Sequence, residues 1–318
     1  VPLDVVAFVT IWGLAGILWA SSPLSYNYMI SAPYPPNFEP YPAADGQNYD
    51  ISSQFALIGQ GLFNGGKMVT YFERPLYSAF LFYLHLLAGQ NFAQILNLQA
   101  FVFAVFPALG YLIGKELHSR GAGIALATVL TWRGVNGLLT ANLLDGSTQK
   151  MFLTDFPTAI GMALLLLLVI RWAKNPQPNW RLAGWVSGCL GLWGFVRPHI
   201  FFLLPFAGLL ALVFYFRQKR RLAAIVGLMI AAYLAATLPW MQFNGSGVSL
   251  IGMYFGRVRS IIIERYPGFP FPKPGGSNIW REVASLGNFP VQLVQPQKSV
   301  PEFVLDHFLN HLVRSPLA

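Results

Sequence analysis

Acidic residues at predicted helix starts are the first candidates for chemistry in this 318-residue chain. It contains only twelve Asp and Glu residues. Three of them, Asp45, Glu73 and Asp155, stand at or just before the start of a predicted helix. A carboxylate at such a position can take a proton from a hydroxyl group as a general base. The alternative for Asp45 and Asp155 is a structural role as helix caps on free backbone N–H groups, and spacing alone favours the caps.

Other polar residues have both a functional and a structural interpretation. His307 and His311 stand four residues apart, which is compatible with a metal site, but packing of the apolar residues beside them explains the predicted helix as well. His85 lies in an apolar segment and is predicted to be a packing residue. Arg133 and Asn136 lie within a predicted membrane span, where they either line a cavity or sit at its outer end.

The composition places these residues in a membrane protein. Hydrophobic residues make up 55% of the chain and charged residues only 10%, whereas roughly a quarter of the residues in a soluble domain are charged. The mean hydropathy is +0.50. Because so much apolar surface exceeds what one core can bury, much of it must face lipid, which excludes most classes of soluble enzyme.

The basic residues mark loops rather than a nucleic-acid surface. The net charge is +9, but the chain has no basic stripe with interleaved aromatic residues, so we expect no nucleic-acid partner. Nine of the 21 Lys and Arg residues fall in three short loops. Such clusters indicate cytoplasmic loops. They are Lys115 and Arg120; Arg171, Lys174 and Arg181; and Arg217, Lys219, Arg220 and Arg221.

Hydrophobic runs of about 17 to 25 residues predict seven membrane spans. They lie near residues 4–20, 94–114, 121–140, 153–172, 182–197, 199–216 and 222–242. With the basic loops inside, the N-terminus is cytoplasmic and residues 21–93 form a first outer loop. A retained first span is favoured over a cleaved signal peptide because the rest of the chain is polytopic. The sequence predicts an integral, multi-pass protein of the plasma (inner) membrane.

The predicted organisation is all-α, a polytopic bundle of transmembrane helices with interfacial helices in the first outer loop. Residues 1–242 form the membrane domain. Residues 243–318 form an extracytoplasmic segment, expected to lead to further spans. Within the first outer loop, residues 21–42 are predicted to be irregular. An amphipathic helix should follow Asp45 and end at Gly65-Gly66, and a second, too short to span, should cover residues 75–87.

Short motifs in and after this loop resemble one family of enzymes. They are Asp45-x-x-x-Tyr49, then Glu73-Arg74-Pro75-Leu76-Tyr77 and Gly89-Gln90-Asn91, and finally Leu153-Thr154-Asp155-Phe156-Pro157. Their order and spacing are similar to those of the GT-C superfamily of membrane glycosyltransferases, in the branch of protein O-mannosyltransferases and aminoarabinose transferases. The similarity covers roughly residues 5–200. The family's middle motif is commonly Glu-Lys-Pro-Pro-Leu, so Arg74 replaces a Lys here and one Pro is absent.

The resemblance implies an activity and a role for each residue. The expected reaction moves a hexose or pentose from a polyprenyl-phosphate donor to a hydroxyl group of a protein, lipid or glycan acceptor, with inversion, at the outer face. Asp45 matches the family's catalytic position and would be the base, with Asp155 as a second catalytic acid. Arg74 would bind the donor phosphate. Glu73 and Tyr49 would contact substrate, and Arg197 would either reach the phosphate or extend to lipid headgroups.

The sequence leaves open the use of a metal ion and a non-catalytic function. A divalent metal ion is compatible with the resemblance, with Glu73 or Asp155 as its ligand, but no ligand cluster around these residues settles its use. The alternative function is a non-catalytic polytopic protein, such as a transporter or flippase of lipid-linked sugars or a helper subunit of a membrane complex. A transporter should carry ionisable residues near the middle of the bilayer. Ten of the twelve acids fall outside in the predicted topology, which favours an enzyme acting on a lipid headgroup.

Overall fold

The structure, a computed structural model, describes residues 2–35, 38–59, 61, 74–143 and 147–243. The chain divides into two units, residues 1–245 and 246–318. Every described residue belongs to the first unit. The candidate residues Glu73, His307 and His311 and the predicted helix end at Gly65-Gly66 therefore lie outside the described residues, as does the whole predicted segment 243–318 apart from its first residue.

The described part is mostly helical, as predicted. Two helices lie in the segment between α1 and α4, α2 (Asp45–Leu57) and α3 (Pro75–Ala88). The bundle itself consists of α1 (Pro2–Ser21), α4 (Phe92–Phe103), α5 (Val105–Leu117), α6 (Arg120–Leu139), α7 (Asp155–Lys174), α8 (Leu182–Gly194), the 3-10 helix η2 (Pro198–Leu203), α9 (Leu204–Tyr215) and α10 (Lys219–Phe243).

Six helical segments in the described part are long and apolar enough to cross a membrane, so the chain is a multi-pass membrane protein. The one predicted span without such a helix, residues 182–197, corresponds to a helix that is shorter than expected. Helix α8 has 13 residues, which extend about 20 Å, against about 30 Å for the hydrocarbon core. Pro198 explains its end, because the residue before a proline disfavours helical backbone and Arg197 is extended with φ −149°.

A proline also divides the predicted span 94–114. Helices α4 and α5 meet at Ala104, and Pro107 stands in the first turn of α5. Proline has no N–H to donate and its ring crowds the carbonyl four residues back, which here belongs to Phe103. The chain is interrupted at that turn, yet the two helices together still make one apolar segment, Phe92–Leu117.

The segment between α1 and α4, predicted to be the first outer loop, contains a β-hairpin that the sequence analysis did not predict. Strands β1 (Ile30–Tyr34) and β2 (Glu39–Pro42) pair antiparallel, with Ile30 opposite Pro42. The prediction of an irregular loop for residues 21–42 is therefore wrong. Its proline content misled that prediction, because proline is tolerated on edge strands, and a two-stranded sheet has only edges.

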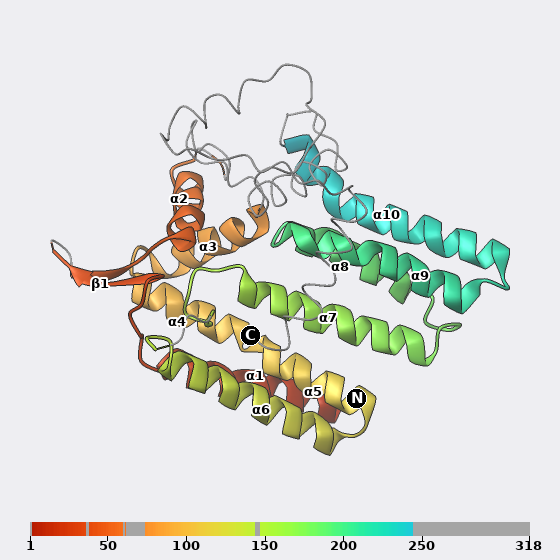
Figure 1. The fold of residues 1–318 in the computed structure, drawn as a ribbon, viewed down its shortest axis with the longest axis horizontal. Helices are drawn as coiled ribbons and strands as arrows, with labels where there is room; N and C mark the ends of the chain where they lie inside the picture. The colour runs from red at the N-terminus through yellow and green to blue at the C-terminus, as the bar shows by residue number, and fades with distance from the viewer. Residues whose placement is uncertain (1, 36–37, 60, 62–73, 144–146, 244–318) are drawn as a thin grey trace, which may run out of the picture. The chain divides into compact units, whose positions relative to one another are not determined.

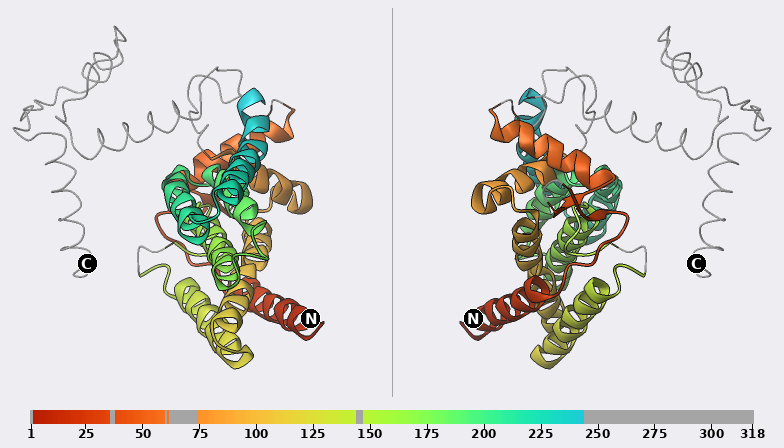
Figure 2. Two further views of the ribbon diagram at one scale, coloured as in Figure 1. Left: turned by 90° about the vertical axis from the view of Figure 1, so that its right-hand side faces the viewer. Right: turned by 90° about the vertical axis from the view of Figure 1, so that its left-hand side faces the viewer.

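Helix α7 lies between two groups of helices (Figure 1). On one side, α5 packs against α1, α6 and α7, and on the other side α8 packs against α7 and α10. Figure 2 shows α1 and α6 on the far side of the bundle from α10. Two glycines bring α5 and α6 into close contact, since a Cβ on Gly123 would meet the Tyr111 carbonyl oxygen at 2.4 Å and one on Gly114 would meet the Gly123 Cα at 2.8 Å.

The three basic loops gather at one end of the bundle. Asp4 of α1 accepts hydrogen bonds from Lys115 and Arg120, at 2.6 and 2.9 Å. Glu116 similarly accepts a hydrogen bond from Arg171 at 2.9 Å. Arg221, from the third loop, donates to Gln177 in the second. The two acids predicted to lie on the cytoplasmic side, Asp4 and Glu116, are therefore both bonded to residues of the basic loops.

Candidate functional site

A cluster of polar side chains lies at the other end of the bundle, on α2 and at the starts of α3 and α7. Arg74, directly before α3, donates from Nη1 to the hydroxyl of Tyr49 in α2. The same nitrogen donates to Oγ1 of Thr154, before α7, at 3.2 Å. The guanidinium carbon also lies 5.4 Å from the centre of the Tyr49 ring. Tyr49 and Thr154 are buried, so two rigid hydroxyl groups fix the position of the Arg74 guanidinium.

An ion pair continues this cluster. Asp155 is the first residue of α7 and accepts a hydrogen bond from Nη1 of Arg197, which precedes η2. Both side chains are about one third exposed, 34% for Arg197 and 39% for Asp155, so the pair adds little stability in contact with water. A backbone hydrogen bond from Leu76 to Phe195, 3.4 Å long, joins the start of α3 to the end of α8 nearby. Of the predicted site residues, Tyr49, Arg74, Asp155 and Arg197 are brought together.

Asp45 shares a helix with this cluster but is not bonded into it. It is the first residue of α2 and is exposed, and it lies one turn before Tyr49, so both residues are on the same side of the helix. Ala44 precedes it with φ 50° and ψ −130°. That conformation is unfavourable for any residue with a Cβ, and such strain is concentrated at functional sites.

The alternative role of Asp45 and Asp155 is that of N-caps of their helices. The N-cap residues are Ala44 for α2 and Thr154 for α7, and neither makes a side-chain capping bond. The two carboxylates stand one position further on, where they still interact favourably with the helix dipole. They are therefore not the caps that spacing alone favoured.

Beside the predicted residues lies a buried pair that the sequence analysis did not find. His85 of α3 has its Nε2 2.7 Å from Oδ1 of Asp50 in α2 and its Nδ1 3.0 Å from the Gly89 carbonyl. Gln54 lies against both side chains and exchanges two 2.9 Å hydrogen bonds with Gln90. The prediction that His85 is a packing residue is confirmed by its burial, but its partner was not predicted.

The sequence of α2 contains a sign of this pair, but a search for apolar residues at helical spacing does not find it. Most of the residues that α2 buries are small or polar: Gly46, Tyr49, Asp50, Ser52 and Ser53. The apolar Ile51 and Phe55 are only half-buried, and Ile58, directly after the helix, is 67% exposed. The helix therefore packs polar residues against α3 and leaves its apolar residues partly uncovered, as a helix lying on a membrane surface would.

A buried tyrosine lies near two acids, Asp50 and Asp155. Tyr77 of α3 is buried, stacks edge-on against Tyr49 at 5.4 Å and donates to Oε1 of Gln99 at 2.9 Å. Burial, with the charges of Asp50 and Asp155, raises the pKa of Tyr77 well above its ordinary value. Its phenol therefore stays neutral and serves as a hydrogen-bond donor.

Lys150 is a second buried group that the sequence analysis did not single out. Its amine donates to the carbonyl oxygens of Ala20 and Ser22, at 2.9 and 2.5 Å, and to Oδ1 of Asn97 at 2.7 Å. Burial lowers the pKa of Lys150 to about 8. These bonds join the end of α1 and α4 to the loop before α7, so Lys150 supports the end of the bundle opposite the basic loops.

The geometry does not decide whether Glu73 or Asp155 binds a divalent metal ion. Within the ranges that the structure describes, no three His, Cys, Asp or Glu side chains come close enough together to hold a metal ion. Of the two candidate ligands, Asp155 is bonded to Arg197, and Glu73 lies outside the described residues. Comparisons with known protein families, with curated proteins and with solved structures found no match for this chain.

Proposed function

We propose that the chain is a glycosyltransferase that moves a sugar from a polyprenyl-phosphate donor to a hydroxyl acceptor on the extracytoplasmic face, with inversion. The observation that carries this proposal is the joining of Arg74 and Arg197 through Thr154 and Asp155 at one end of an apolar bundle. Two guanidinium groups at such a position suit a lipid phosphate, which they can bind through paired N–H donors.

The proposed reaction assigns a step to each side chain. Asp45 takes the proton of the acceptor hydroxyl as its oxygen attacks the anomeric carbon. The bond from that carbon to the phosphate oxygen breaks, and Arg74 stabilises the charge that develops on the leaving lipid phosphate. Asp155 orients Arg197 toward the same phosphate. A divalent ion held by Glu73 or Asp155 is compatible with this scheme and is not required by it.

The exposure of Asp45 supports its role as the base. It is exposed on the surface of the protein, so an acceptor can approach it, and it lies one helical turn from Tyr49, whose hydroxyl contacts Arg74. The strained backbone of Ala44 immediately before it fits a residue held in place for function. We propose the same orientation as for the family, with the basic loops cytoplasmic and this cluster at the outer face of the plasma (inner) membrane.

The direct test is transfer of radiolabelled sugar from polyprenyl-phosphate donors in membranes that contain the full chain. We expect Asp45→Asn to lower the rate by about 10²- to 10⁴-fold, the contribution of a positioned general base. Glu39→Gln is the matched control, because Glu39 lies in the neighbouring strand β2 and takes no part in the cluster. Equal rates for Asp45→Asn and wild type would remove Asp45 from the mechanism, and no transfer from any such donor would remove the proposed activity.

A further inference from the structure

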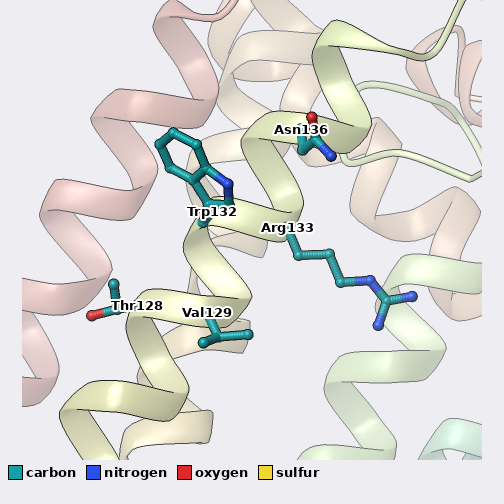
Figure 3. A pocket seen from close by; sticks show the side chains of 5 residues that line it. All are labelled: Thr128, Val129, Trp132, Arg133 and Asn136. Carbon is teal, nitrogen blue, oxygen red and sulfur yellow. The ribbon is translucent and has the colours of Figure 1, made fainter.

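A hollow of about 400 Å³ lies beside exposed residues of α6. Among the residues that the structure describes, those that line it all belong to that helix and recur at helical spacing. Figure 3 shows Trp132 and Arg133 projecting to different sides of α6, with Val129 about one turn away. The lining consists of Thr128, Val129, Trp132, Arg133 and Asn136.

The hollow presents hydrogen-bond donors that have no partner in the described part of the chain. Arg133 and Asn136 are exposed and stand three residues apart, so their side chains are neighbours on the helix. Within the described residues, neither side chain makes a hydrogen bond or an ion pair. Thr128, by contrast, donates to the carbonyl of Ile124. A guanidinium on a membrane-spanning helix requires an anion or water, because hydrocarbon offers it no acceptor.

The position of Arg133 along the helix indicates where that anion lies. Arg133 is about 20 Å along the axis from Arg120 and about 9 Å from Leu139, at 1.5 Å per residue. Arg120 lies in a basic loop at the opposite end of the bundle from Arg74. An arginine side chain can extend from such a depth to the headgroup region nearer Leu139. The ligand must therefore combine a negative group at the interface with a part that occupies hydrocarbon.

We propose that this hollow binds an anionic glycerophospholipid, with its phosphate on Arg133 and Asn136 and an acyl chain along Val129 and Trp132. The charge is complementary, because the described lining contains Arg133 and no acidic residue. Trp132 is 73% exposed, and indole rings prefer the membrane interface, where one edge meets lipid chains and the N–H meets headgroups. A free phosphate ion would use the two polar side chains and leave this apolar surface without a role.

Lipid retention during purification tests the proposal. The full chain is extracted from vesicles of phosphatidylglycerol and phosphatidylcholine, washed in detergent, and the bound lipid is measured by native mass spectrometry. We expect phosphatidylglycerol to be retained, and Arg133→Gln to retain it about tenfold less, as expected for the loss of one charge-assisted contact. Arg220→Gln is the matched control, because Arg220 is also exposed but Lys219 and Arg221 remain beside it.

Each other outcome contradicts this assignment. Equal retention of phosphatidylglycerol by wild type and Arg133→Gln would show that Arg133 is not part of a lipid site. Equal retention of phosphatidylcholine would remove the role of charge. Three further results would assign the hollow to another ligand. The bound phosphatidylglycerol could be displaced by free glycerol phosphate, by a copurifying protein, or by a polyprenyl phosphate that phosphatidylglycerol does not displace in return. Arg133→Lys, which keeps the charge, should retain most of the lipid and shows that the helix still folds.

The lipid site does not depend on the proposed glycosyl transfer. Arg133 lies on α6, whereas the transfer residues lie on α2 and at the starts of α3, α7 and η2. Retention of lipid by the Asp45→Asn protein would support the lipid site whatever that variant does to transfer. Absence of transfer in wild type, conversely, would leave the lipid measurement valid.

Discussion

The two ring nitrogens of His85 both face acceptors, the carboxylate of Asp50 and the carbonyl of Gly89. A neutral imidazole donates from only one nitrogen. The arrangement therefore requires one additional proton, carried either by His85 as an imidazolium or by Asp50. In both cases a buried pair joins α2 to α3, and so fixes the helix of Tyr49 and Asp45 against the helix that follows Arg74.

Removal of one partner of the Asp50–His85 pair should strongly destabilise the contact between α2 and α3. We expect Asp50→Asn to lower the free energy of unfolding by about 3 kcal/mol or more, because it removes the carboxyl group, and with it the shared proton, from a buried pair. Thermal unfolding in detergent measures the change. Asp45→Asn makes the same chemical substitution at an exposed position of the same helix and should change stability by less than about 1 kcal/mol. Similar losses in both variants would argue against the pair as the junction.

At the scale of helices, the contact between α5 and α6 depends on the absence of side chains at Gly114 and Gly123. Each lies against backbone atoms of the other helix, which cannot move aside as a flexible side chain can. The same two helices carry the charged end of the bundle, since Lys115 and Arg120 both bind Asp4. Separation of the two helices would therefore also disturb the contact of α1 with them.

A single methyl group should show this dependence. In Gly123→Ala the new Cβ would stand 2.4 Å from the Tyr111 carbonyl oxygen, so we expect a loss of about 1–3 kcal/mol in stability from overpacking. Gly137→Ala is the matched control on the same helix, where a Cβ has no atom within 4 Å. It should be neutral or stabilising by up to about 1 kcal/mol, from the helix propensity of alanine. Comparable destabilisation by both substitutions would show that the close approach is unimportant.

At the scale of the whole chain, hydrophobic length and loop charge predicted most of the bundle, because the lipid environment imposes both. The predicted spans at 121–140, 153–172 and 222–242 correspond to α6, α7 and α10 within a few residues. Local backbone effects were not visible in that pattern. Pro107 and Pro198 shortened or divided helices, and the hairpin formed in a proline-rich segment.

The candidate site was predicted in part, for a related reason. Residues at helix starts, such as Asp155, can be recognised from the sequence because helices begin at predictable places. The ion pair of Asp155 with Arg197 and the pair of Asp50 with His85 join residues 42 and 35 positions apart. Such partners depend on which helices pack together, and hydrophobic periodicity carries no information on that choice.

The gathering of all three basic loops at one end permits a test of orientation. In a Cys189→Ser background, a cysteine replacing the exposed Gln47 should react with a membrane-impermeant thiol reagent in intact cells. A cysteine replacing Arg220, at the opposite end, should react only after the membrane is opened. This expectation follows from the preference of Lys and Arg for the cytoplasmic side. The reverse pattern would invert the proposed topology and place the polar cluster inside the cell.

The bonding of Asp4 also constrains the order in which the chain can fold during synthesis. Its carboxylate receives hydrogen bonds from Tyr111, Lys115 and Arg120, which lie 107 to 116 residues later in the sequence. Helix α1 thus enters the membrane long before these partners leave the ribosome. Until then its charge must remain in water or at the headgroups, because an unpaired carboxylate is costly in hydrocarbon. The first helix can therefore gain these three contacts only after residue 120 has been synthesised.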